Sequence, residues 1–114
     1  MGAATPLVAA RDANRWIMDE VHNQSGYINA MVFSGAAAKT STPPASARIV
    51  KITTTVAVYV NVGAAAAVPA ADVTDGTASA LLPAGGSVTL DLAGAATVGV
   101  AAGAAAVVTL TYYT

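Results

Sequence analysis

The feature that most constrains the fold is an alternation of apolar residues in segment 48–63, read RIVKITTTVAVYVNVG. One side of its two-residue repeat holds four valines, Val56, Val58, Val60 and Val62. The other side holds Ala57, Tyr59 and Asn61. Successive side chains of a β-strand point to opposite faces of a sheet, whereas a helix shows a repeat of about 3.6 residues. The segment therefore predicts a half-buried strand.

The same alternation returns in three later segments, at residues 87–92, 97–100 and 107–113. Turn-forming sequences separate them, including the PAGG run at 83–86 and a long loop at 63–77 that contains Asp75-Gly76. Short strands at this spacing with Gly-rich turns are typical of all-β folds. We expect an antiparallel β-sandwich or small barrel over residues 48–114.

Residues 1–47 have a different character, and we expect them to form an N-terminal arm and a linker. Apolar residues recur near helical spacing over residues 8–23 and predict a short helix, although an extended arm would use the same residues. Residues 27–33 alternate as a strand would. Residues 34–47 read as a linker by composition, held extended by Pro43-Pro44. The predicted domain boundary is therefore at residue 48.

The composition indicates a protein that belongs to an assembly. Apolar residues make up 55% of the chain and charged residues 10%, against about 25% charged in an ordinary soluble domain. Much of the apolar fraction is alanine, so the core should be thin. A surface with so few charges is typical of proteins buried among neighbours, and we expect a homo-oligomer.

The charges are unevenly distributed along the chain. The net charge of −1 argues against nucleic acid as the main partner. All five basic residues lie before residue 52, at Arg11, Arg15, Lys39, Arg48 and Lys51. Beyond it the only charged residues are acids, Asp72, Asp75 and Asp91. We infer that the two parts of the chain meet different surroundings.

Catalytic and metal-binding patterns are weak. Cysteine is absent, and His22 is the only histidine, so the Asp19-Glu20-Val21-His22 cluster is best interpreted as a solvated helix end. No second histidine or other base is placed to activate a Ser or Thr nucleophile. We therefore predict neither an enzyme nor a catalytic residue, and no cofactor.

Two loop motifs only partly match known binding patterns. The GAAAKT run at residues 35–40 departs from the phosphate-binding loop pattern in spacing and leads into a proline-rich segment. Asp72 and Asp75 would supply carboxylates to a calcium ion, but two acids three apart are ordinary in turns. No metal site is predicted.

The arm contains aromatic, apolar and basic residues suited to docking on a protein. Stacking on nucleic acid is the alternative, but the low charge of the arm favours a protein surface. The predicted anchors are Arg11, Arg15, Trp16, Ile17, Tyr27, Met31 and Phe33.

A membrane helix is a further alternative for residues 92–113, which carry no charge. Alanine, glycine and threonine dominate the segment, and no lysine or arginine flanks it, so insertion would be weak. Its valines and threonines favour a strand. We therefore expect no membrane partner.

The β-module resembles the small β-sandwich structural proteins of tailed bacteriophage virions. The resemblance rests on Ile52-Thr53-Thr54, on Val58-Tyr59-Val60 in a strand that ends at Gly63, and on Leu82-Pro83-Ala84-Gly85. It covers residues 48–114 and leaves out the arm. It implies a structural role on the particle, as a capsid decoration or cement protein or as a head–tail or tail accessory, with no catalytic residues to transfer.

The leading hypothesis is a decoration or cement protein on the capsid exterior. Its partners would be the major capsid protein or other virion proteins, gripped through residues 1–47. A receptor- or carbohydrate-binding module of a tail or fibre is the second hypothesis. A small membrane protein of the holin type, using residues 92–113, is the third.

Overall fold

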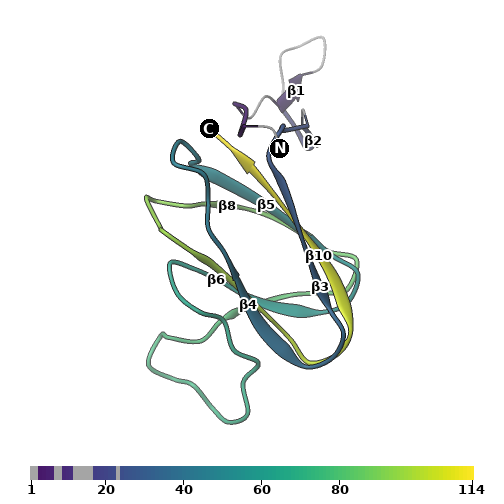
Figure 1. Cartoon of the computed structure of the whole chain (residues 1–114), viewed down its shortest axis with the longest axis vertical. Helices are drawn as coiled ribbons and strands as arrows, with labels where there is room; N and C mark the ends of the chain where they lie inside the picture. Colours follow the sequence, from purple (N-terminus) through teal and green to yellow (C-terminus); the bar gives the residue numbers. More distant parts are fainter. Residues whose placement is uncertain (1–2, 7–8, 12–16, 23) are drawn as a thin grey trace.

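The computed structural model describes residues 3–6, 9–11, 17–22 and 24–114. Within these residues the secondary structure consists of β-strands, with no helix (Figure 1). The strands are β1 (Ala9–Arg11), β2 (Ile17–His22), β3 (Ile28–Phe33), β4 (Ala37–Ser41), β5 (Ile49–Thr54), β6 (Val58–Val62), β7 (Ala80–Leu82), β8 (Ser87–Asp91), β9 (Val98–Ala102) and β10 (Ala106–Tyr113).

Eight of these strands form two packed antiparallel sheets, in the orders β3-β10-β5-β8 and β4-β9-β6-β7 (Figure 1). Successive strands pass from one sheet to the other, except that β6 and β7 are neighbours in the same sheet. The first strand of the eight, β3, pairs with the last, β10. An eight-stranded sandwich connected in this way is a jelly roll. The predicted antiparallel β-sandwich is confirmed.

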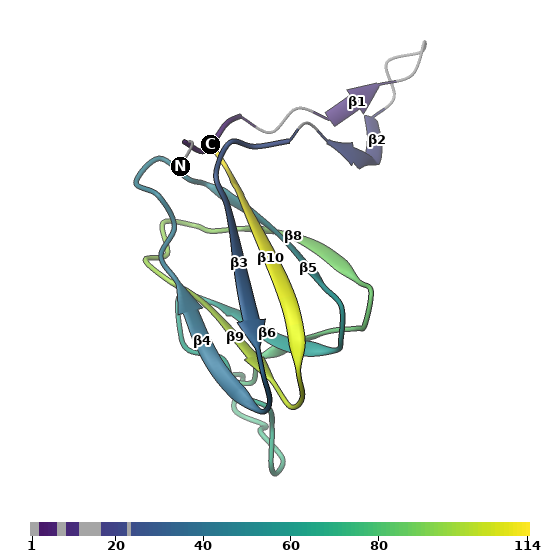
Figure 2. The same cartoon turned by 45° about the vertical axis from the view of Figure 1, so that its right-hand side comes forward.

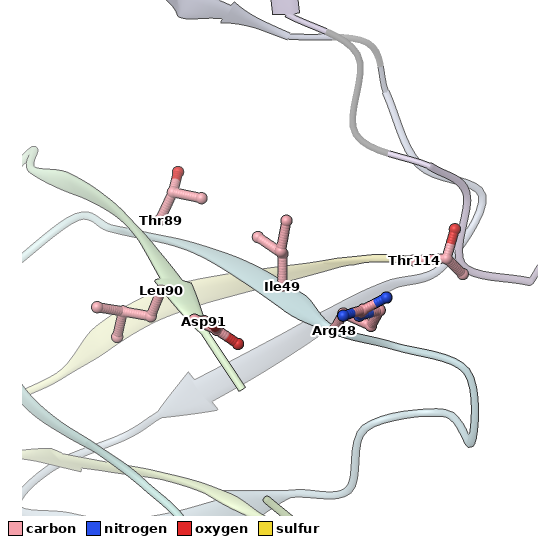
Figure 3. A pocket seen from close by; sticks show the side chains of 6 residues that line it. All are labelled: Arg48, Ile49, Thr89, Leu90, Asp91 and Thr114. Carbon is pink, nitrogen blue, oxygen red and sulfur yellow. The ribbon is translucent and has the colours of Figure 1, made fainter. Parts of the chain in front are cut away.

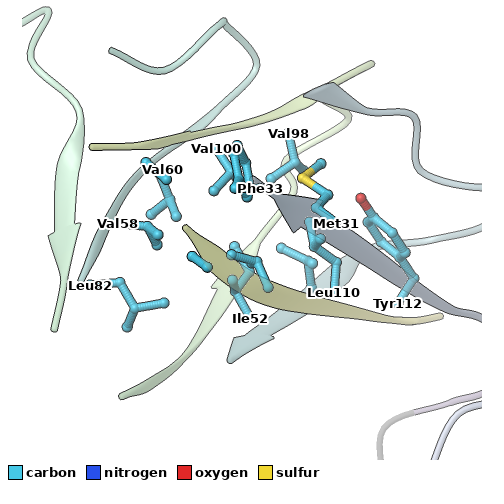
Figure 4. Packing of buried hydrophobic residues seen from close by; sticks show 14 of the residues in the cluster. Met31, Phe33, Ile52, Val58, Val60, Leu82, Val98, Val100, Leu110 and Tyr112 are labelled. Atoms are coloured by element: carbon cyan, nitrogen blue, oxygen red, sulfur yellow. The ribbon is translucent and has the colours of Figure 1, made fainter. Parts of the chain in front are cut away.

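The core lies between the two sheets and is filled by every second residue of the strands (Figure 4). Its largest fully buried side chains are Tyr112, Phe33, Ile52, Leu92, Leu110, Val50, Val58, Val98, Val100 and Val108. Burial of each such side chain contributes about 1.5–3 kcal/mol relative to exposure. The valine alternation of residues 56–62 is used as expected, because Val58 and Val60 point into this core and Tyr59 lies on the opposite face.

The sandwich extends further toward the N-terminus than the sequence indicates. The expected boundary at residue 48 falls inside it, since β3 pairs with β10 and β4 pairs with β9. Residues 37–41 were expected to be linker, but they form the edge strand β4. Ala37 and Ala38 give little periodic signal, so this strand is specified by its hydrogen bonds to β9 rather than by its own pattern.

The expected helix over residues 8–23 is wrong for the residues that the structure describes. Residues 9–11 and 17–22 form β1 and β2, which pair antiparallel with Arg11 opposite Ile17. The β-branched Ile17 and Val21 favour an extended backbone, and cross-strand hydrogen bonds replace those of a helix. Residues 8, 12–16 and 23 lie outside the described residues.

The alternative of a membrane helix over residues 92–113, which the sequence did not favour, is not found, because this segment contains β9 and β10. Across the part of the chain that the structure describes, there is no helix of the length and apolarity needed to cross a membrane.

β9 is buried on both faces, because the long connection between β6 and β7, residues 63–79, folds back over its outer side. Gly99 lies under this loop. A Cβ atom at Gly99 would approach Ala64 O and Ala66 N to 2.5 Å. Ala66 is buried at this contact, and the Ala67 N–H donates to Ser79 Oγ at 3.1 Å. The loop therefore packs at a defined position on β9, and this close packing requires glycine at position 99.

Replacing Gly99 with alanine should push the loop off β9. We expect the free energy of unfolding to fall by about 1–3 kcal/mol, as for other overpacked sites. Guanidinium unfolding measures the loss. Gly103→Ala is the matched control, because a Cβ atom at Gly103 meets nothing within 4 Å. Equal stability of the two variants would show that the loop does not rest on Gly99.

Candidate interaction site

β1 and β2 form a separate two-stranded sheet that projects from one end of the sandwich (Figure 2). Among the described residues, each of these strands pairs with the other and with no strand of the jelly roll. The two segments that join the hairpin to the sandwich, residues 3–6 and 24–27, meet at the end of β10. The contacts of these two segments, the base of the hairpin, determine the orientation of the hairpin relative to the sandwich.

The C-terminal end of β10 holds the first of these segments. Thr5 forms a parallel bridge with Tyr113, and the Thr114 N–H donates to Thr5 O at 2.8 Å. The second segment continues directly into β3, where the Tyr112 N–H donates to Tyr27 O at 3.0 Å. Both segments are therefore fixed to the same strand.

Ser25 joins the two segments through its side chain. Its hydroxyl accepts hydrogen bonds from the Thr5 and Tyr27 N–H groups, both at 3.1 Å, and donates to Tyr112 O at 2.5 Å. A hydroxyl has one donor and two acceptor positions, so all three are used. Ser25 is 3% exposed. We call this arrangement of Thr5, Ser25, Tyr27 and Tyr112 the Ser25 junction.

Tyr112 connects the Ser25 junction to the core. Its ring meets that of Tyr27 edge to face, with the centroids 5.9 Å apart and the planes at 71°. Its hydroxyl donates to Ser41 Oγ on β4 at 2.7 Å, and Asn29 Nδ2 donates to the same oxygen at 3.0 Å. A polar link thus crosses between the two sheets.

Burial affects the pKa values of Tyr112 and Tyr113. It raises the pKa of Tyr112, against the smaller effect of the Ser41 hydrogen bond. It also raises the pKa of Tyr113, where a hydrogen bond with the Ser25 backbone acts in the opposite direction. In both cases burial favours the neutral phenol over the charged phenolate in the folded protein.

The seven predicted anchors fall into four groups, the last of which, Met31 and Phe33, is buried in the core. Arg11 and Ile17 lie opposite each other on the hairpin. Arg15 and Trp16 belong to residues 12–16, between β1 and β2, and lie outside the described residues. Tyr27 is half-buried at the base of the hairpin.

Met31 and Phe33 are corrections. Both are buried in the core, because β3 is a strand of the sandwich and turns these residues inward. The ammonium nitrogen of Lys39, Nζ, lies over the Phe33 ring, 5.1 Å from its centroid. Neither side chain is available to a partner. Ser25 was missed, and only its position beside Gly26, a turn signal, marked it in the sequence.

A pocket lies at the same end of the molecule as the hairpin base (Figure 3). It is open to solvent and has a volume of about 410 Å³. Residues distant in the sequence line it, namely Arg48, Ile49, Thr89, Leu90, Asp91 and Thr114. It offers one cation, one anion and two hydroxyl groups to a ligand.

One of the two acidic residues of the long loop, Asp75, forms hydrogen bonds within the loop. Asp75 Oδ1 accepts hydrogen bonds from the Thr77 N–H at 3.1 Å and the Thr77 hydroxyl at 2.6 Å, which lower the pKa of Asp75. Within the described residues, no three His, Cys, Asp or Glu side chains are grouped closely enough to hold a metal ion.

Comparison with protein-family models, with curated proteins and with solved structures found no match for this chain.

Substituting Ser25 with alanine should loosen the hairpin base. The change leaves two N–H donors and one carbonyl oxygen without their partner, and we expect a loss of about 2–4 kcal/mol in the free energy of unfolding. Hydrogen exchange of the Thr5 and Tyr27 amides should accelerate together. The exposed Ser46→Ala variant should change neither quantity. Unchanged exchange at Thr5 would contradict the role assigned to the junction.

The raised pKa of Tyr112 predicts a loss of stability at alkaline pH. A phenol whose pKa is higher in the folded than in the unfolded protein contributes stability that is fully present below about pH 10 and declines as the pH rises through and above that value. Urea unfolding between pH 8 and 11 measures the decline. Tyr112→Phe should reduce the slope, whereas Tyr59→Phe, on the outer face of β6, should retain it. Equal slopes in both variants would contradict this assignment.

Proposed function

We propose that the protein is a structural component of a bacteriophage virion, a decoration or cement protein that binds the outer surface of the capsid. The β1–β2 hairpin and its base would make the contact. One observation carries the proposal: a two-stranded sheet, unpaired with the sandwich, is held out from one end by the buried Ser25 junction.

The hairpin is suited to a partner for a physical reason. A two-stranded sheet alone is at best marginally stable in water, because it lacks a surface against which to bury its side chains. Its outer edges also retain backbone groups that can pair with another chain. Docking on a capsid surface would provide both kinds of contact.

The residues of the hairpin segment support a protein partner. Trp16, Arg11 and Arg15 are of the types most often found to dominate the binding energy of protein interfaces. Ile17 is an apolar residue of β2. The five predicted anchors that remain after removal of the two core residues thus lie within residues 11–27 of the sequence.

The architecture supports a place on a virus particle. Jelly rolls recur in viral capsid domains and in lectins, although a fold by itself does not define a function. The resemblance of residues 48–114 to small virion proteins points the same way. The scarcity of charged residues fits a protein surrounded by copies of other subunits.

A receptor- or carbohydrate-binding module of the tail is the second candidate. The pocket beside β5 and β8 favours it, because Arg48, Asp91 and Thr89 would offer both donors and acceptors to sugar hydroxyl groups. A glycan array without a hit for the full chain would remove this candidate.

The capsid hypothesis is tested with particles that lack the protein. Replacing residues 7–23 with a short Gly-Ser linker, while keeping Thr5 and Ser25, should abolish co-sedimentation with these particles and preserve the β-type circular dichroism of the sandwich. Trp16→Ala alone should weaken binding about 30-fold, the effect of losing a dominant interface residue.

Leu81→Ala is the matched control, since it removes an exposed apolar side chain from β7, outside the hairpin. Its binding should equal that of the unmodified protein. The hairpin would have no part in attachment if the protein without residues 7–23 still covered the particles at full copy number.

A further inference from the structure

The outer face of the β3-β10-β5-β8 sheet carries exposed apolar side chains at its β3 edge. Ile28, Val32 and Val107 are 41%, 62% and 43% exposed. Val32 and Val107 are direct cross-strand partners, and Ile28 lies four residues before Val32 on the same face of β3. These three residues define the β3–β10 patch.

Two lysines flank the β3–β10 patch. Lys39 Nζ donates to Val32 O at 2.6 Å, which fixes its ammonium group beside the patch. Lys51 lies on β5 opposite Thr111, which in turn faces Ile28, and all three residues line one shallow hollow. The patch is therefore an apolar surface with a positive rim.

The loop of residues 63–79 has the complementary character. Val68 and Val73 are 43% and 44% exposed, and the acids Asp72 and Asp75 lie beside them without any basic residue in the loop. Connections longer than about 12–15 residues are uncommon in compact domains and are usually functional. The loop extends from the lower part of the molecule, away from the hairpin (Figure 1).

Contacts within the chain hold the loop in an ordered conformation. Its start is seated on Gly99, the Ala67 N–H binds Ser79 across its two arms, and Thr77 holds the Asp75 carboxylate. Such ordering lowers the entropy cost of docking.

We propose that the 63–79 loop of one copy docks on the β3–β10 patch of a second copy. Val68 and Val73 would cover Ile28, Val32 and Val107, with Asp72 and Asp75 beside Lys39 and Lys51. The loop cannot reach the patch of its own chain, because it is seated on the outer face of β9 while the patch is on the outer face of the opposite sheet. This inference does not depend on the capsid hypothesis.

The contact is heterologous, since one surface of each copy meets a different surface of the next. Contacts of this kind produce rings when the rotation closes and open chains when it does not. The valines supply most of the attraction, whereas the rim charges determine the orientation and the association rate. Association should therefore weaken as salt screens the rim.

Analytical ultracentrifugation of the full chain tests the proposal. The unmodified protein should form assemblies that grow with concentration and become smaller when salt is raised from about 0.05 to 0.5 M. Val32→Asp in the patch and Val73→Asp in the loop should each give monomers. Both side chains are exposed, so each variant should keep the circular dichroism and unfolding midpoint of the unmodified protein.

An equimolar mixture of the two variants provides the decisive measurement. It retains one intact patch and one intact loop, so it should form dimers and nothing larger. Leu81→Asp, at an exposed apolar site on β7, should assemble as the unmodified protein does.

Three outcomes would overturn the proposal. The first is that the unmodified protein stays monomeric up to about 1 mM. At that concentration even a weak contact, with a binding free energy of about −4 kcal/mol, forms. The second is a mixture of variants that stays monomeric. The third is assembly that persists in both single variants, which would assign it to another surface such as the hairpin.

Discussion

The pairing of β10 is the interaction on which the rest of the structure depends. β10 lies between β3 and β5, and its buried residues Val108, Leu110 and Tyr112 form the centre of the core. Its C-terminal end also binds both segments that lead to the hairpin. Because β10 forms the centre of the core and also binds both segments that lead to the hairpin, the orientation of the hairpin is coupled to the packing of the sandwich. Loss of order in the core would be transmitted directly to the proposed binding element.

The molecule presents two kinds of surface at different places. At one end the hairpin stands on the buried Ser25 junction, where each polar position of the hydroxyl is used. Elsewhere the long loop and the β3–β10 patch are exposed, apolar at the centre and oppositely charged at the rim. The first arrangement suits attachment to a larger body, and the second suits contact between copies.

Sequence reasoning identified the strands whose own residues alternate. The strands expected at residues 87–92, 97–100 and 107–113 overlap β8, β9 and β10, and the valine alternation of residues 56–62 contains β6. Valine, leucine and threonine at a two-residue repeat favour a pleated, half-buried surface. β4 and the hairpin were not identified. Ala37, Ala38 and Lys39 show no alternation, and the residues of β1 and β2 fit a helix nearly as well as a strand. For the candidate site, Arg11 and Ile17 were located on the projecting arm, but Met31 and Phe33 were assigned to it when they belong to the core.

The amino-acid sequence alone was sufficient for the all-β class, the turns and the uneven distribution of charge, because these depend on local conformation and composition. The strand order, the inclusion of residues 28–41 in the sandwich and the Ser25 junction were decided only by tertiary structure. Each depends on hydrogen bonds between residues far apart in the chain, as from Ser25 to Tyr112 or from β4 to β9. A side chain that satisfies a distant backbone group leaves no periodic pattern, and its role becomes visible only once the sheets are assembled.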